Sequence, residues 1–202
     1  MAEAEVRRRP GGRSARVRAA VLDAALELLA AHGLEGLKVA DVAARAGVHE
    51  TSIYRRWGTR ENLLIDALLE ATGALTVPDT GSLRDDLVAY ATDLAAFLAT
   101  PTGHALEHTL AAAGDDPAMR EARDRYWAAR AGGSMQIVVR AVERGELPDT
   151  VDPRLAIEML VSPVHFRVLL TREPIEPGMP ARLVDALLGG IAVSRPPSDP
   201  AR

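Results

Sequence analysis

The stretch Val39–Trp57, VADVAARAGVHETSIYRRW, is the most informative part of the chain, and it continues as GTRENLLIDALLE over residues 58–70. Its first apolar side chains recur at the i, i+3, i+4, i+7 spacing of one helix face: Val39, Val42, Ala43 and Ala46. Gly47 follows at once, where a left-handed, helix-ending conformation costs glycine nothing. Ile53 and Trp57 are four residues apart and share the inward face of a second short helix. The pattern predicts a helix-turn-helix at about 38–57, followed by another helix.

The polar side chains of this stretch fall on the outer face of the second helix or beside it. The candidates for contact with double-stranded DNA are Lys38, Arg45, His49, Glu50, Thr51, Ser52, Tyr54, Arg55, Arg56 and Arg60. A helix-turn-helix places its second helix in the major groove, and arginine and tyrosine side chains donate to phosphates. The alternative is a helical hairpin whose basic face is merely solvated. The arginines stand where a duplex would lie, which favours DNA.

Residues 15–75 resemble the DNA-binding domain of the TetR/AcrR family of bacterial transcriptional regulators. The resemblance rests on LDAALELLAAHG at 22–33, Val42-Ala43, Ala46-Gly47-Val48, Tyr54, Trp57, and Arg60 with Leu63. It implies that Tyr54 and Arg60 bind phosphates. It also implies that Glu50, Thr51 and Arg55 face base edges.

Four positions depart from the family pattern. Trp57 replaces the usual phenylalanine, and Arg60 replaces the usual lysine while keeping its charge. Lys38 and His49 stand where the family usually has a threonine and a serine that cap the two helices. Loss of a capping oxygen costs ~1 kcal/mol, so we expect slightly weaker helix starts and an intact motif. His49 could instead donate to a phosphate.

Composition is typical of a globular chain, with 48% hydrophobic and 26% charged residues over 202 positions. We see no apolar run long enough to span a membrane and no signal peptide. The chain has no cysteine, which excludes disulfides and thiolate chemistry and suits a cytoplasmic location. We also find no phosphate-binding glycine loop and no nucleophile motif, so we expect neither cofactor nor catalytic residue.

Charge is unevenly distributed along the chain. Residues 1–75 carry 11 Lys+Arg against 10 Asp+Glu, whereas the remainder carries 13 against 18. Six arginines precede residue 19: Arg7, Arg8, Arg9, Arg13, Arg16 and Arg18. With Pro10-Gly11-Gly12, they indicate a flexible basic arm over residues 1–14. The arm either contacts DNA beside the main site or serves as a solubilising tail.

Hydrophobic spacing elsewhere predicts an all-α chain of about nine helices. We expect Ser14 to cap the first helix, a DNA-binding domain over 15–75, and a domain break at 76–81, TVPDTG. Residues 80–195 would form a second helical domain, and 196–202 a disordered tail. In that domain Ser82 and Asp152 would begin helices, Gly132-Gly133 would weaken a long helix, and Pro163 would interrupt another.

The C-terminal half resembles one subgroup of the same family's regulatory domains. The matching segments are Arg144-Gly145-Glu146-Leu147, Asp152-Pro153 and residues 162–167. The resemblance implies a homodimer in which the last two helices of each subunit pair. The residues that suit either that interface or the monomer core are Leu155, Met159, Phe166, Leu169, Leu183, Leu187 and Ile191. Two recognition helices related by a two-fold axis would reach half-sites ~34–36 Å apart, or a multiple of that distance.

The family resemblance also implies a small-molecule effector bound in the C-terminal domain. Candidate pocket residues are Tyr90, Phe97, His104, His108, Tyr126, Trp127, Met135 and His165, each of which suits ordinary core packing as well. The expected function is a homodimeric repressor of a palindromic operator, released by that effector.

A second reading is a helical ligand-binding or metal-dependent enzyme domain with a vestigial helix-turn-helix. It rests on His104-Ala-Leu-Glu107-His108, which fits the H-x-x-E-H zinc-protease pattern, with His165 or Asp115 as a third ligand. So short a pattern arises easily by chance, and we expect no metal.

Overall fold

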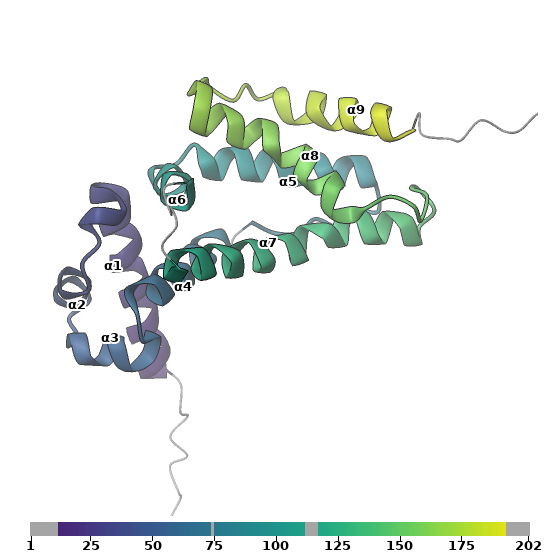
Figure 1. Cartoon of the computed structure of the whole chain (residues 1–202). Helices are drawn as coiled ribbons and strands as arrows, with labels where there is room; N and C mark the ends of the chain where they lie inside the picture. Colours follow the sequence, from purple (N-terminus) through teal and green to yellow (C-terminus); the bar gives the residue numbers. More distant parts are fainter. Residues whose placement is uncertain (1–11, 74, 112–116, 193–202) are drawn as a thin grey trace, which may run out of the picture.

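The computed structural model describes residues 12–73, 75–111 and 117–192, and within these ranges the chain is helical without strands (Figure 1). The elements are α1 Gly12–Gly36, α2 Val39–Ala46, α3 Glu50–Trp57, α4 Arg60–Thr72, α5 Leu83–Leu98, α6 Pro101–Ala111, α7 Pro117–Glu143, α8 Pro153–Phe166, a π-turn η1 Arg167–Thr171 and α9 Met179–Ala192. The predicted all-α class is confirmed. None of these helices has the length and apolar character needed to cross a membrane.

The helix-turn-helix forms as its residues predict. Gly47 ends α2 with φ 66° and ψ 36°, and the amide of Val48 donates to the carbonyl of Ala43 at 3.0 Å. Ile53 and Trp57 are buried in the core that α3 shares with α2 and α4, with 1% and 8% of their surfaces exposed. The outer face of α3 is therefore fixed by two inward anchors one turn apart.

Capping at the helix starts follows the sequence with one exception. Lys38 and His49 occupy the N-cap positions of α2 and α3 without a side-chain hydrogen bond, so both family caps are indeed lost. Ser82 and Asp152 cap α5 and α8 as expected. The prediction that Ser14 caps α1 is wrong, because the helix already begins at Gly12.

The N-terminal boundary of α1 also shortens the expected basic arm. Residues 12–14, assigned to that arm, are helical. Residues 1–11, which hold Arg7, Arg8 and Arg9, lie outside the described residues, as does the expected tail at 196–202.

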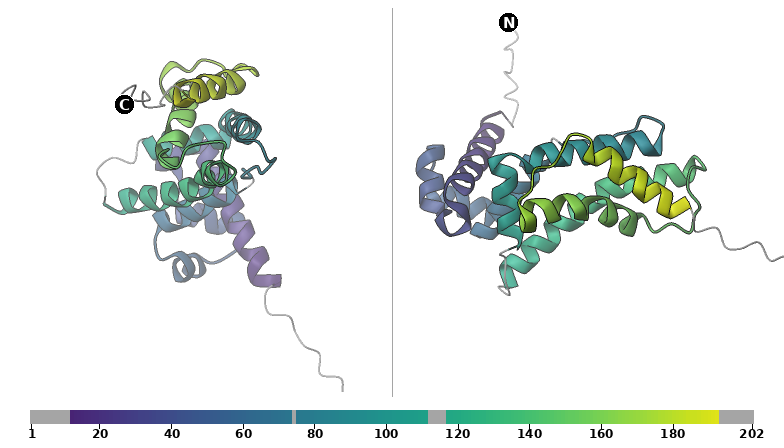
Figure 2. Two further views of the ribbon diagram at one scale, coloured as in Figure 1. Left: turned by 90° about the vertical axis from the view of Figure 1, so that its right-hand side faces the viewer. Right: turned by 90° about the horizontal axis from the view of Figure 1, so that it is seen from above.

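Helices α1–α4 form one end of the molecule, and α5, α7, α8 and α9 run away from it along the long axis (Figures 1 and 2). Helix α6 lies across the junction and packs on α1 and α5. The core of the first unit includes side chains from α6 and the start of α7: Leu106, Leu110, Met119, Ala122 and Tyr126. The break at 76–81 is therefore a boundary in sequence, while packing continues across it.

Helix α8 corrects the expectation at Pro163. The helix continues through Pro163 to Phe166 and then loosens into the π-turn, ending at Arg172 with φ 54°. A proline removes one backbone donor. Here its neighbours Leu160 and Val164 are fully buried and hold both sides of it in the core. Helix α7 likewise runs through Gly132-Gly133 from Pro117 to Glu143.

Candidate nucleic-acid interface and internal cavity

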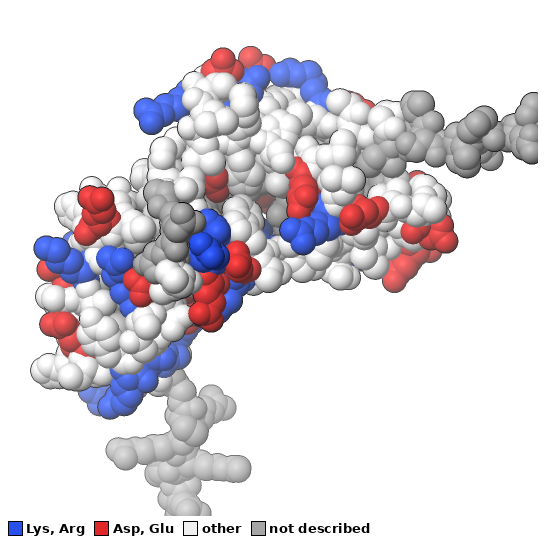
Figure 3. Space-filling view, viewed as in Figure 1, with Lys and Arg blue, Asp and Glu red and all other residues white. Residues whose placement is uncertain are grey.

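The outer face of α3 carries exposed polar side chains. Exposed positions among the candidates are Lys38, Arg45, His49, Glu50, Thr51, Tyr54, Arg55 and Arg56, while Ser52 and Arg60 are half-buried. Tyr54 is 48% exposed although it is a large aromatic residue. Blue atoms gather at the lower end of the N-terminal helices in Figure 3.

Trp57 links α3 to α4 by two hydrogen bonds. Its indole nitrogen donates to Asp66 Oδ2 at 3.0 Å, and its carbonyl accepts from Asn62 Nδ2 at 2.9 Å. The guanidinium of Arg56 lies 5.4 Å from the indole centroid, within cation–π range. A phenylalanine at this position could make neither the indole hydrogen bond nor as strong a cation–π contact.

Several basic side chains of this surface already have partners within the described chain. Arg45 is paired with Glu27 of α1, and Arg60 with Glu61 at 3.1 Å. The Arg45–Glu27 pair is exposed, and exposed pairs contribute only about 0–1 kcal/mol, so a phosphate can replace Glu27 at little cost. The Arg60–Glu61 pair is partly buried. Arg55 makes no side-chain hydrogen bond or ion pair with the described residues, which leaves it available to a base edge.

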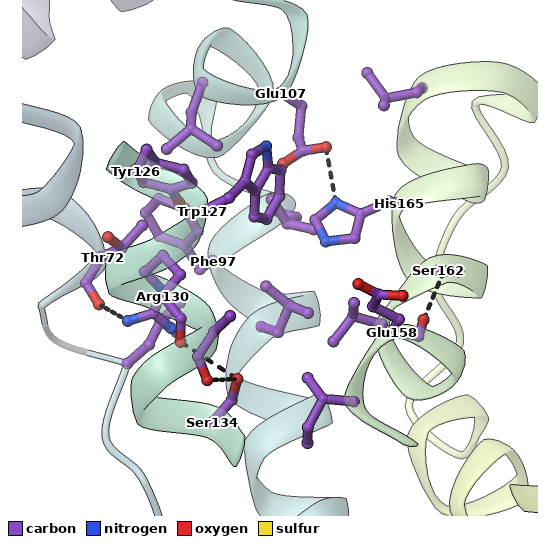
Figure 4. Close-up of a pocket in the computed structure, with 18 of the residues that line it drawn as sticks. Thr72, Phe97, Glu107, Tyr126, Trp127, Arg130, Ser134, Glu158, Ser162 and His165 are labelled. Carbon is purple, nitrogen blue, oxygen red and sulfur yellow. Dashed lines mark hydrogen bonds and ion pairs between the residues drawn. The ribbon is translucent and has the colours of Figure 1, made fainter. Parts of the chain in front are cut away.

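A cavity of about 1160 Å³ lies among α5, α6, α7, α8 and η1, and it reaches the end of α4 (Figure 4). Seven of the eight candidate pocket residues line it: Tyr90, Phe97, His108, Tyr126, Trp127, Met135 and His165. His104 does not line it; its side chain is exposed and its ring stacks 6.5 Å from that of His108. The rest of the lining is mainly aliphatic.

Aromatic rings build one wall of this cavity. Trp127 packs edge-on against Tyr126 at 5.2 Å and against His165 at 5.8 Å between ring centroids. Burial raises the pKa of Tyr126 to about 12, against a weaker lowering by its hydrogen bond with Thr72 and by the charge of Arg130. The phenol is therefore neutral at physiological pH.

Glu107 is the buried acid of the cavity, with 3% of its surface exposed. Its Oε2 lies 2.8 Å from His165 Nδ1, and its Oε1 has no hydrogen-bond partner. The sequence analysis places Glu107 only in the metal motif and not among the cavity residues. Its burial can be predicted from sequence, since Gly103, Leu106, Glu107 and Leu110 follow the i, i+3, i+4, i+7 spacing of the buried face of α6.

The same geometry argues against the zinc-protease interpretation. Glu107 points inward to His165, whereas His104 and His108 are exposed. Within the described residues no three histidine or acidic side chains are grouped to hold a metal, and Asp115 lies outside them.

Two family profiles match the chain on either side of the break. Residues 21–67 match "Bacterial regulatory proteins, tetR family", and residues 77–187 match "Tetracyclin repressor-like, C-terminal domain". The second match alone spans more than half of the 202 residues.

Similar proteins agree with these profiles. The chain is 38% identical over 179 residues to the HTH-type transcriptional regulator AqdR of Rhodococcus erythropolis, covering 88% of this chain and 86% of AqdR. It is 33% identical over 181 residues to the DNA-binding transcriptional repressor TetR of Mycobacteroides abscessus, covering 84% and 90%.

Solved structures give the same fold. The TetR family regulator SCO0332 has a TM-score of 0.76 at 32% identity, covering 87% of this chain and 98% of that one. FadR of Bacillus subtilis in complex with stearoyl-CoA has a TM-score of 0.67 at 20% identity, covering 86% and 98%, a likeness of fold alone. The family consists of regulators, not enzymes. The chain therefore belongs to the TetR family of helix-turn-helix transcriptional regulators.

Proposed function

We propose that this regulator is a homodimeric repressor that occupies a palindromic operator and leaves it when a small molecule enters the cavity. The observation that carries the proposal is the position of the cavity. Tyr126 both lines the cavity and belongs to the hydrophobic core of the DNA-binding helices. A molecule that moves α7 would thus move the support of α3.

Hydrogen bonds continue this link to the recognition helix. On α7, Arg130 donates to the carbonyl of Thr72 at 3.1 Å, and Arg125 donates to Asn62 Oδ1 at 2.7 Å. Asn62 in turn donates to the carbonyl of Trp57 at the end of α3. A ligand that favours one arrangement of α7 would favour one position of α3, and its effect is limited to its differential affinity for the two states.

On the DNA side, we assign Tyr54 and Arg60 to phosphate contacts and Glu50, Thr51 and Arg55 to base edges. Lys38, Arg45, His49, Ser52 and Arg56 surround these residues and would add backbone contacts. The support is the exposed outer face of α3 together with the free side chain of Arg55.

For the dimer, we propose a paired α8–α9 interface. Helix α8 and the π-turn leave four large apolar side chains exposed: Leu155, Met159, Phe166 and Leu170, at 53%, 53%, 53% and 70%. The first three are among the expected interface candidates, whereas Leu187 is buried in the monomer core. The side chain of Ile191 lies outside the described residues. Exposed large apolar side chains along one helix indicate a binding face, and a second copy would cover them; Phe166 and Leu170 also line the cavity.

The size and the lining of the cavity suit a small-molecule effector. Its volume slightly exceeds the range of ~300–1,000 Å³ that is usual for small-molecule sites, which are mostly apolar. FadR of Bacillus subtilis, solved in complex with stearoyl-CoA, supports the capacity of this fold to hold a ligand that has a long acyl chain.

The proposed function can be tested by selecting genomic fragments with the purified protein at two salt concentrations. We expect enrichment of a palindrome whose half-sites lie one helical turn or a multiple apart. Binding that is salt-sensitive but blind to sequence would contradict operator recognition.

A further inference from the structure

We propose that the effector is an apolar, ring-containing molecule that is neutral or cationic and carries a hydroxyl or N–H group, which donates to the Glu107 carboxylate. The inference deepens the proposed function and rests on it. Its basis is a carboxylate that is buried inside the cavity with one oxygen left without a donor.

Close packing forces Glu107 into the cavity. Helix α6 approaches α5 so tightly that a Cβ added to Gly103 would lie 2.2 Å from the carbonyl oxygen of Phe97. Gly103, Leu106 and Leu110 of the same face are all buried. Glu107 shares that face and cannot turn to solvent without pulling α6 away from its neighbours.

The carboxylate is only half satisfied in this position. His165 Nδ1 contacts Oε2 at 2.8 Å, and Oε1 has no partner among the described residues. An ionised carboxylate offers about four acceptor sites, and buried polar groups are nearly always paired, so an orphan oxygen requires an explanation. A donor supplied by a ligand provides one.

No guanidinium contacts Glu107 among the described residues, although two arginines line the cavity. Arg130 donates to the carbonyl of Thr72 at 3.1 Å, and Arg154 pairs with Glu158 at 2.7 Å. A ligand carboxylate or phosphate placed against Glu107 would therefore meet a like charge. The Glu107 end of the cavity disfavours an anionic group and favours a donor.

The walls beside Glu107 indicate the shape of the ligand. Figure 4 shows Glu107, Trp127 and His165 grouped together, with Tyr126 and Phe97 on one side and Glu158 and Ser162 below His165 on α8. Flat aromatic rings pack well against other rings in offset or edge-on geometry. Trp127 is 40% exposed, so it lies where the cavity meets solvent and can yield to an entering ring.

The test compares three matched probes: 2-naphthol, which has a donor, naphthalene, which lacks one, and 2-naphthoate, which is an anion. Affinity is measured by calorimetry on the full-length protein. Since a hydrogen bond to a charged group is among the stronger ones, 2-naphthol should bind about 10-fold or more tighter than naphthalene. 2-Naphthoate should bind more weakly than 2-naphthol.

Three variants locate the effect. Glu107→Leu should reduce the preference for 2-naphthol to less than about two-fold, and Glu107→Gln, which keeps an acceptor, should retain part of it. Glu158→Gln is the matched control, since it neutralises an exposed acid of the same cavity, and it should leave the preference intact. Circular dichroism melting checks that each variant is folded.

The inference is overturned if the probes bind equally, if 2-naphthoate binds best, if none binds, or if the preference survives in Glu107→Leu. The proposed function fails in a different way. In that case 2-naphthol would bind with the expected preference, while affinity for the selected operator fragment would stay the same with and without it.

Discussion

Single side chains determine both what the molecule contacts and how its cavity responds to pH. On α3, Ile53 and Trp57 face inward, and this leaves Tyr54 and Arg55 outward. Which side chains of α3 face inward and which face outward can be predicted from sequence, because both follow the local helix period. The orphan oxygen of Glu107 is not, because it depends on where His165, 58 residues away, is placed.

Phosphate and base contacts respond differently to mutation. Tyr54→Phe and Arg60→Ala should each weaken binding to all sequences alike, and Arg60→Ala, which removes a charge, should also reduce the salt slope by about 1. Arg55→Ala or Glu50→Ala should change preference at particular base pairs by about 1–3 kcal/mol. Binding isotherms on an operator and its single-base variants at two salt concentrations distinguish the cases. Uniform weakening by Arg55→Ala would refute its base-reading role.

Tyr126 should make the fold sensitive to alkaline pH. Its folded pKa of about 12 exceeds the usual value of 10, so burial disfavours the ionised form. The stability that this shift contributes is complete below pH 10 and is lost as pH rises from 10 to 12, about 3 kcal/mol in all. Denaturant melts across this range should show the loss in the wild type. Tyr126→Phe should show a shallower decline, and identical slopes would argue against the buried phenol.

Some helix boundaries can be predicted from the local sequence, and others cannot. Gly47, Ser82 and Asp152 specify their helix boundaries because the bonds involved are local. At Ser14 and Pro163 the local signal was overridden: α1 begins earlier, and buried Leu160 and Val164 carry α8 through the proline. His104 was expected in the cavity because it is aromatic. Its helix register, one position past Gly103, turns it to solvent.

The contact between α5 and α6 should be intolerant of any added side chain. Gly103→Ala would place its Cβ against backbone atoms of Phe97 and Leu98, at 2.2–2.9 Å, and should destabilise the protein by about 1–3 kcal/mol or more. Gly132→Ala in α7 is the matched control, since its Cβ meets nothing within 4 Å. It should stabilise by about 0.5–1 kcal/mol. Thermal melts of both variants check the pair, and equal effects would contradict the close approach.

At the scale of the whole molecule, the proposed function requires that the DNA-binding end, the cavity and the α8 face act together. The DNA-binding end and the cavity share core residues, which come from α6 and include Tyr126. At the level of sequence, the dimer is predicted from the family resemblance alone. The monomer structure adds which interface candidates remain exposed.

The exposed α8 face should be essential for dimerisation. Met159→Glu places a charge at its centre, where residue 159 is 53% exposed, so the fold should persist while the dimer dissociates. Analytical ultracentrifugation should give a dimer for the wild type and a monomer for the variant. A monodisperse wild-type monomer, or a dimer that tolerates the glutamate, would show that this face is not the interface. Glu143→Gln, on α7, provides a surface control.

The central claim is that two copies of this chain read one operator together. The most direct measurement is hydroxyl-radical footprinting of the enriched fragment, with the mass of the complex determined in parallel. A homodimeric regulator should protect two half-sites ~34–36 Å apart or a multiple of that distance, with two chains per operator. A single protected half-site occupied by one chain would contradict this claim.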